Sequence, residues 1–305
     1  MLAAVATLPA AAGANDASLL ERHRPLLRYD SDERHFAVSV AALTTVSEVE
    51  RDRGGSAPVP TPSFLGARYG DGRRASDADR LVPARAPRAG EPLVYGRAIR
   101  DGAGRRWLQY WLFFTANPQD RGVVSTGRHR GDWELFQLRL GGPGRPVEAT
   151  FVQHSWAEGC AWSEIDRAGS APVVYVANGS HALYPRAGRA DRPFPDPNDE
   201  ADGRGHRVRP AVHRVGTDSP RWMAWPGRWG EDDGGWVPGA EPSPRGPAFQ
   251  RERWDDPGRF HVAEARPCGS GPPGRPWQTA LTLIVGAAIA LAGLLALRRS
   301  YNRGP

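Results

Sequence analysis

The segment 107–114, with the sequence WLQYWLFF, constrains the fold of this 305-residue chain more than any other segment. Successive side chains of a β-strand point to opposite faces of the sheet, and here both faces are apolar. We therefore expect a central strand that is covered on both sides. The chain also contains 11 Trp, 7 Tyr and 9 Phe, which supply enough aromatic bulk for a sizeable core and exclude wholesale disorder.

Other short stretches of strand-like composition surround this segment and are separated by turns rich in glycine and proline. The Asp101-Gly102 pair between the first two stretches predicts a hairpin. Many short strands at this spacing favour an all-β fold, an antiparallel β-sandwich with long irregular loops. The predicted strands cover 93–99, 106–115, 132–140, 147–154 and 172–177.

Two segments predict how the protein meets a membrane. Residues 279–297 form an uncharged apolar run, TALTLIVGAAIALAGLLAL, long enough as a helix to span the ~30 Å core of a bilayer. We expect one C-terminal transmembrane helix, and the arginines that follow it place the tail 298–305 in the cytoplasm. Residues 1–18 are expected to be a signal peptide that lacks its charged first part. The protein is therefore expected in the cell membrane, with its large domain extracytoplasmic.

The rest of the chain divides by composition. Residues 19–240 are expected to form the sandwich domain, with a mobile insertion at about 51–91 that is rich in Arg, Gly, Ala and Pro. Residues 241–276 are rich in proline and glycine and are expected to form a final segment and extended stalk. The formal charge of +6 comes from arginines scattered along the chain, a pattern that does not indicate nucleic-acid binding.

Cys160 and Cys268 are the two cysteines of the chain. In an exported protein they can pair, and closing a loop of about 107 residues would stabilise the fold by ~4–5 kcal/mol. Such a disulfide would tie the stalk to the domain. Two unpaired thiols are the alternative.

Residues 127–134, GRHRGDWE, carry the most informative polar pattern. Asp132 and Glu134 are two apart, so on a strand their carboxylates point to the same face. His129 has the other parity, but Gly131 can adopt backbone angles closed to other residues and so let the imidazole join them. Such a cluster would suit Mg²⁺, Ca²⁺ or Mn²⁺ better than structural zinc. A solvated acidic pair beside an arginine is the alternative.

Three further polar residues, His154, Ser180 and His181, follow apolar strands. Strand ends lead into loops, and a rigid scaffold that positions loop residues is where binding sites usually lie. We therefore expect these three residues to contact a ligand. A serine hydrolase is not favoured, because the chain has no G-x-S-x-G motif and each candidate serine is adjacent in sequence to a histidine.

Five motifs follow one another in order over residues 24–260. They are RPLLRYDSDERHFAVSV, LQYWLFFTAN, HRGDWELFQLRL, FVQHSWAEGCAW and PVVYVANGSHALYP, followed by Pro-Arg-Gly-Pro at 244–247. These motifs resemble those of the vacuolar protein sorting-associated protein 62 family. The resemblance implies kinship rather than a biochemical activity.

The Asp-Trp-Glu segment is also similar, more distantly, to necrosis-inducing proteins, which are secreted cytolysins with a β-sandwich fold and the motif GHRHDWE. That resemblance implies that His129, Asp132 and Glu134 hold a divalent cation that helps to engage lipid head groups. An acidic ligand at the end of that family's aromatic strand corresponds to Asn117, whose amide oxygen can also coordinate. Gly131 stands where the motif has its second histidine.

These features together predict a membrane-anchored extracytoplasmic binding module. Its divalent-cation site would engage phosphate or sugar hydroxyls of an envelope lipid or glycan. A binding module needs no nucleophile, and none is evident in the sequence. One alternative is a metal-dependent hydrolase of a phosphoester or glycan, in which Glu134 or His181 acts as base toward a metal-bound water. The other is a structural or sorting scaffold without a ligand.

Overall fold

The computed structural model describes residues 10–40, 91–119, 129–192, 196–217, 219–220, 223, 228–229 and 243–272. The predicted transmembrane segment 279–297, the tail 298–305 and residues 51–90 of the predicted insertion lie outside this set. Within the described ranges, no helix has the length and apolar character needed to cross a membrane.

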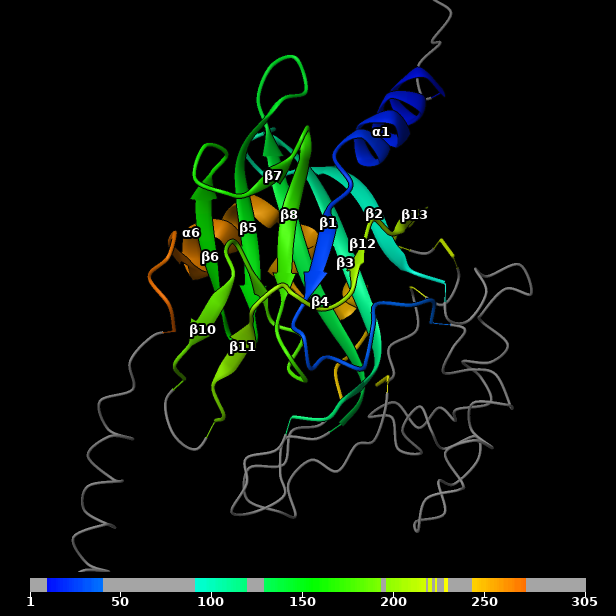
Figure 1. Ribbon diagram of the computed structural model, residues 1–305. Coiled ribbons are helices and arrows are strands. Elements are labelled where there is room, and N and C mark those ends of the chain that lie inside the picture. Colours follow the sequence, from blue (N-terminus) through cyan, green and yellow to red (C-terminus); the bar gives the residue numbers. More distant parts are fainter. Residues whose placement is uncertain are drawn as a thin grey trace, which may run out of the picture.

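Two β-sheets pack face to face (Figure 1). The seven-stranded sheet contains, in spatial order, β13 (Ala211–Arg214), β2 (Leu93–Arg100), β3 (Arg106–Asn117), β4 (His129–Leu140), β5 (Pro146–Gln153), β6 (Trp156–Ala161) and β14 (Ala265–Pro267). The five-stranded sheet contains β12 (Arg207–Val208), β1 (Leu26–Tyr29), β8 (Ala171–Val176) and β7 (Arg167–Ala168), with β9 (Leu183–Tyr184) also paired to β8. A separate hairpin contains β10 (Gly188–Ala190) and β11 (Asp199–Ala201).

The sandwich is mostly β-sheet, but its strand directions are mixed, which corrects the prediction of a purely antiparallel fold. Strands β2 to β6 are antiparallel neighbours, as expected for segments joined by short turns. The pairs β1–β8, β13–β2 and β14–β6 are parallel. The partners in each parallel pair are far apart in sequence, so long connections bring them together and no hairpin geometry fixes their direction.

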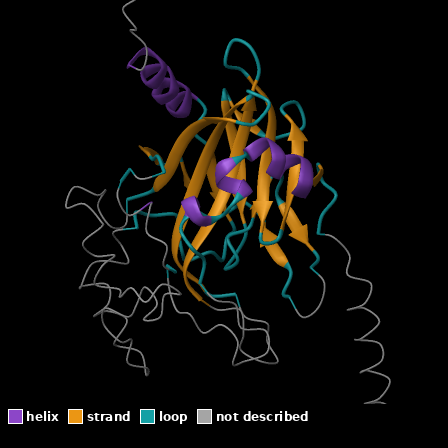
Figure 2. Ribbon diagram, turned by 180° about the vertical axis from the view of Figure 1, so that it is seen from behind, coloured by secondary structure: helices purple, strands orange, loops and turns teal. Residues whose placement is uncertain are grey.

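Strand β3 is covered on both faces, as its sequence predicts. Leu108, Tyr110, Leu112 and Phe114 pack into the core between the two sheets. Side chains of the opposite parity pack on the other face, beneath helices α5 (Glu252–Asp255) and α6 (Pro257–Glu264). Figure 2 shows these short helices lying across that face of the seven-stranded sheet. The molecule therefore has three layers, with β3 in the middle one.

The expected stalk over 241–276 is corrected for its described part, 243–272. This segment forms the 3-10 helix η4 (Pro247–Phe249), α5, α6 and β14, and it buries Trp254 and Phe260 against the sheet. Its prolines do not prevent packing, because η4 and α6 have proline in their first turn, where the missing N–H leaves no helical hydrogen bond unmade. The side chain of Asp256 caps α6 by accepting a hydrogen bond from the backbone N–H of Arg259.

A disulfide joins Cys160 of β6 to Cys268, with an S–S distance of 2.01 Å. Next to it, the buried carboxylate of Glu158 accepts hydrogen bonds from the backbone N–H groups of Gly269 and Gly271. The disulfide and these hydrogen bonds together fasten the end of the described chain to the edge of the seven-stranded sheet.

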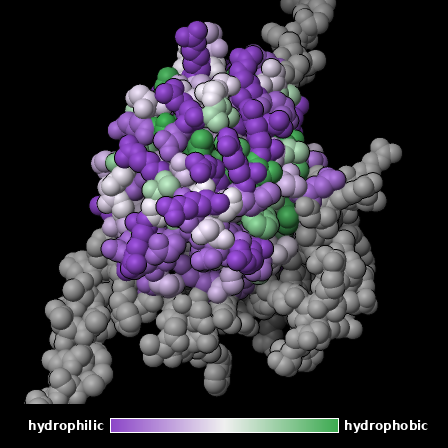
Figure 3. Space-filling view, in the orientation of Figure 1, coloured by the Kyte–Doolittle hydropathy of each residue, from purple (hydrophilic) through white to green (hydrophobic). Residues whose placement is uncertain are grey.

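Helix α1 (Ala10–Arg22) includes part of the segment expected to be a signal peptide, which stays a prediction. Leu19 and Leu20 are buried in the core between the sheets, and Tyr110 donates a hydrogen bond to the carbonyl of Leu20. Asp16 also forms an ion pair with Arg106. Figure 3 shows that the surface on the side of the five-stranded sheet is mostly hydrophilic, with only small hydrophobic patches.

Gly131 lies in β4 with a φ angle of +59°, and a Cβ at this position would collide with the backbone carbonyl of Trp229. Trp229 is fully buried and packs against Phe113 and Trp133. The close approach of these two segments therefore requires glycine. It also gives β4 a left-handed residue immediately before Asp132.

We expect Gly131→Ala to lower the free energy of unfolding by more than about 3 kcal/mol, because backbone strain and a backbone clash add. The matched control is Gly104→Ala, since Gly104 has a φ of +76° but a Cβ added there would meet nothing within 4 Å. This control should cost only about 1–2 kcal/mol of strain. Urea unfolding of both variants measures the difference, and equal losses would contradict the close contact between Gly131 and Trp229.

Candidate functional site

A pocket of about 490 Å³ opens where β3 ends and β4 begins. All four predicted metal ligands line it: Asn117 from β3, and His129, Asp132 and Glu134 from β4. Trp133 of β4 and residues from distant segments complete the wall. The residues from distant segments are His154, Ser155, Arg192, Asp196, Arg228, Pro244, Arg245, Phe249, Gln250 and Arg253.

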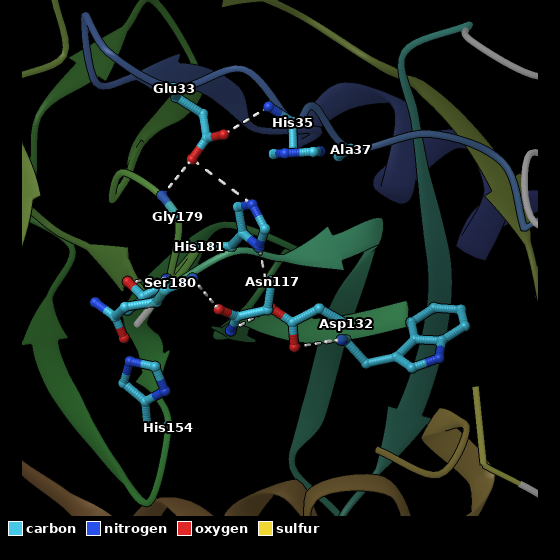
Figure 4. A network of polar contacts seen from close by, with 12 residues as sticks. Glu33, His35, Ala37, Asn117, Asp132, His154, Gly179, Ser180 and His181 are labelled. Carbon is cyan, nitrogen blue, oxygen red and sulfur yellow. Dashed lines mark hydrogen bonds and ion pairs between the residues drawn. The ribbon is translucent and has the colours of Figure 1, made fainter. Parts of the chain in front are cut away.

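The carboxylate of Asp132 is held by three donors (Figure 4). Its Oδ2 accepts hydrogen bonds from the side-chain amide of Asn117 at 3.3 Å and from Nδ1 of His181 at 3.0 Å. Its Oδ1 accepts the backbone N–H of Trp133 at 2.9 Å. Burial alone would raise the pKa of Asp132, but the hydrogen bond from His181 and the nearby imidazoles outweigh burial and lower it. Asp132 is therefore an ionised and positioned carboxylate.

Glu134 lies on the same face of β4 in a different environment. Its side chain lines the pocket, the residue is only 5% exposed, and no hydrogen-bond or ion-pair partner for it exists among the described residues. Burial, and then the negative charge of Asp132, raise the pKa of Glu134 well above its usual value. The raised pKa shifts Glu134 toward its protonated form, which can both donate and accept a hydrogen bond. The sequence predicts that the two carboxylates share one face of the strand, and the fold gives them different surroundings.

His181 supports Asp132 from behind the pocket. Its ring is fully buried and stacks on Phe114 with ring centroids 3.9 Å apart. Nε2 lies 3.6 Å from a carboxylate oxygen of Glu33, while Nδ1 contacts Asp132. Burial lowers the pKa of His181, but the two carboxylates outweigh burial and raise it to about 8. Glu33 in turn accepts the backbone N–H of Gly179 at 2.6 Å, so this network joins the N-terminal segment to the turn after β8.

Of the other two predicted ligand-binding residues, His154 lies at the pocket surface and Ser180 lies behind it. His154 lines the pocket, with Nε2 3.7 Å from the carboxylate of Asp199. Ser180 is buried behind the pocket and donates a hydrogen bond to Asp199 at 2.7 Å. Asp199 also accepts the hydroxyl of Tyr184 at 2.6 Å. The structure therefore brings His154 to the pocket surface and leaves Ser180, like His181, in a supporting position.

The donor chemistry of the predicted cation site suits a hard ion, but its side chains do not surround a common point. His129 lines the pocket, and its Nδ1 has no hydrogen-bond partner in the described part of the chain. Both oxygens of Asp132 already accept hydrogen bonds from the protein. Over the described ranges, no group of three or more His, Cys, Asp or Glu side chains has an arrangement that could hold a metal ion.

The arginines of the pocket are functional candidates that the sequence analysis missed. Arg192 is paired with Asp196 at 3.2 Å and approaches Asp199 at 3.6 Å. Arg253 donates a hydrogen bond to the backbone carbonyl of His154 at 2.6 Å. Because arginine is common throughout the chain and residues 241–276 were expected to be a stalk, no local signal marked Arg245 or Arg253.

Comparison with known proteins finds similarity at the level of structure alone. No family model matches the chain, and no curated protein matches it. Similarity to the vacuolar protein sorting-associated protein 62 family thus stays a prediction. The structural neighbours are necrosis-inducing proteins, the class that residues 127–134 resemble.

Three solved structures are similar to this chain. One, described as "Toxin fold as basis for microbial attack and plant defense", is 16% identical over 68% of this chain and 76% of its own, with a TM-score of 0.35. "NLPPya in complex with glucosamine" is 14% identical over 65% and 72%, with a TM-score of 0.33. "Crystal structure of non-toxic HaNLP3 protein" is 15% identical over 68% and 77%, with a TM-score of 0.34.

We expect His181→Gln to lower the free energy of unfolding by about 3 kcal/mol, because Asp132 and Glu33 would be left buried without their cation. Folding raises the pKa of His181 from 6.5 to about 8, so its contribution is complete below pH 6.5 and is lost as the pH rises through 8. The wild-type protein should therefore lose stability over this pH range, and the variant should not lose this contribution.

Urea unfolding between pH 6 and pH 9 measures both effects. The matched control is His213→Gln, because His213 packs edge-on against Tyr95 and has no carboxylate partner in the described residues. If His181→Gln and His213→Gln have the same stability and the same pH profile, the buried charge network is not a stabilising unit.

Proposed function

We propose that the pocket binds a hydroxyl-rich head group, such as the terminal sugar of an envelope lipid or glycan. The observation that carries this proposal is Glu134, a buried carboxyl that lines the pocket without a partner among the described residues. A buried polar group without a hydrogen bond costs about 1–3 kcal/mol. A ligand that supplies the hydrogen bond recovers this free energy, so such a group favours binding.

The remaining lining residues support a sugar in particular. Asn117, His129 and His154 offer further donors and acceptors, while Trp133 and Phe249 contribute apolar surface to the wall. A sugar ring presents hydroxyls around its edge and C–H groups on its faces, which matches this mixture. The pocket volume of about 490 Å³ lies within the ~300–1,000 Å³ common for small-molecule sites.

A divalent cation in the same pocket is the second candidate. Two observations favour it: Nδ1 of His129 is buried without a hydrogen-bond partner in the described part of the chain, and the side chain of Glu134 lines the same pocket. His129, Asp132, Glu134 and Asn117 would hold the ion after small side-chain rearrangements. Mg²⁺, Ca²⁺ or Mn²⁺ would supply a positive charge that attracts phosphate or hydroxyl oxygens.

We also propose that residues 279–297 anchor the protein in the cell membrane with the pocket on the extracytoplasmic side. The support is their uncharged apolar composition and the arginines that follow. Recovery of the full chain in the soluble fraction after cell lysis, without detergent, would contradict the anchoring.

Glu134→Leu should weaken sugar binding by about ten-fold or more while leaving the free energy of unfolding unchanged or increased. An apolar side chain of similar size removes both the ligand's partner and the cost of the unpartnered carboxyl. Isothermal titration of the full chain with glucose, galactose and mannose measures binding. The matched control, Glu200→Gln, changes an exposed glutamate of β11 outside the pocket and should bind like the wild type. Failure of all three sugars at millimolar concentration defeats the proposal.

For the cation, we expect calorimetric titration of the full chain with Mg²⁺, Ca²⁺ or Mn²⁺ to show binding that Asp132→Asn weakens, because this change removes a ligand charge. Glu200→Gln again serves as the control. No binding at millimolar ion, or equal binding by Asp132→Asn, rules out the cation site and leaves direct sugar binding to be judged by Glu134→Leu.

A further inference from the structure

The part of the pocket wall that the structure describes is rich in arginine. It contains four arginines, at 192, 228, 245 and 253, and three residues with carboxyl groups, Asp132, Glu134 and Asp196. Asp132 is directed to His181, and Asp196 is paired with Arg192. Arg192 thus has a carboxylate partner, whereas Arg245 and Arg253, from the C-terminal segment, have no ion pair among the described residues.

Arg253 has a partly buried guanidinium group with no carboxylate within ion-pair distance in the described residues. Its NH2 group donates to the carbonyl of His154, and the guanidinium carbon lies 5.4 Å from the ring centre of Phe260. Burial lowers the pKa of Arg253, against the weaker opposing influence of Glu134 and Glu264. A cation in this position is only partly satisfied, because a neutral carbonyl does not replace a counter-charge.

Arg245 adds a second guanidinium group, in more exposed surroundings than that of Arg253. It is exposed, it lines the same pocket, and its side chain has no hydrogen bond or ion pair among the described residues. Arg245 and Arg253 belong to one short segment that η4 and α5 hold against the sheet. The planar guanidinium group has paired N–H donors that match the two oxygens of a carboxylate or phosphate, so two such groups in one pocket favour an oxyanion.

We propose that the ligand is an anionic saccharide, whose oxyanion binds to Arg245 and Arg253 while its hydroxyls reach Glu134. This inference rests on the proposed function and narrows it to a substrate class. The oxyanion is a ring carboxylate or a phosphate ester, which share the charge and the paired oxygens that arginine recognises. A neutral sugar would fill the pocket without supplying a counter-charge to either arginine.

Isothermal titration of the full chain in a polyoxyethylene detergent, which contains no sugar, tests the inference. The probes are glucose, glucuronate, glucose 6-phosphate and inorganic phosphate. We expect glucuronate or glucose 6-phosphate to bind about ten-fold or more tightly than glucose, and added salt to reduce this difference. Arg245→Gln should bring the affinity for the anionic sugars to within about three-fold of the affinity for glucose.

The matched control is Arg189→Gln, which changes an exposed arginine of β10 outside the pocket and should bind every probe like the wild type. Arg253→Gln should act like Arg245→Gln. If Arg253→Gln does not fold, Arg245→Gln still decides the result, because the Arg245 side chain is exposed and makes no polar contact within the described residues.

The outcomes separate this inference from the proposed function. If glucose binds and the anionic sugars bind no more tightly, the anionic class is wrong and the sugar pocket stands. If inorganic phosphate binds as tightly as glucose 6-phosphate, the arginines hold an anion without recognising a sugar, and the saccharide class is wrong. If no probe binds, the proposed sugar site and the anionic-saccharide inference are both wrong. A preference for glucuronate or for glucose 6-phosphate identifies the oxyanion and supports the inference in either case.

Discussion

The buried imidazole of His181, placed between Asp132 and Glu33, is the interaction on which the site depends. Two carboxylates inside a protein core would be prohibitive without a nearby cation and hydrogen bonds. His181 supplies both, and its stacking on Phe114 fixes the orientation of the ring. The network lowers the pKa of Asp132 and so keeps it ionised, and the charge of Asp132 in turn helps to raise the pKa of Glu134. The opposite pKa shifts of Asp132 and Glu134 thus depend in part on His181 and Glu33, which lie behind the pocket.

Much of the fold follows from local pattern, and the rest depends on contacts between distant segments. The apolar residues on both faces of 107–114 predict a central covered strand, and the alternation around Asp132 predicts which face its carboxylate occupies. The parallel pairs β1–β8 and β13–β2 have no such signal, because strand direction there depends on long connections. The proline-rich segment 243–272 misleads for a related reason, since composition does not reveal that Trp254 and Phe260 fit the face of the sheet opposite the sandwich core.

The candidate site shows the same division. The spacing of His129, Asp132 and Glu134 predicts that they meet, and all three line one pocket. Their chemical states could not be predicted from spacing, because Glu33 lies in the N-terminal segment and reaches His181 only through the fold. The supporting role of Ser180 has a similar origin, since its partner Asp199 lies in β11. A polar residue at a strand end thus predicts participation in a site, but not whether it faces the ligand or supports another residue.

The polar groups of this region fall into two classes with different consequences. Asp132, Asp199 and Arg192 have several partners each, so the protein itself recovers the free energy of burying them. Glu134 and Arg245, by contrast, have no polar partner in the described part of the chain, and both line the same pocket. Burying Glu134 without a partner lowers stability, so its position in the pocket is better explained by a ligand than by folding, whereas Arg245 is exposed and accessible to that ligand. The well-supported residues then serve to hold the unsupported ones where a ligand can reach them.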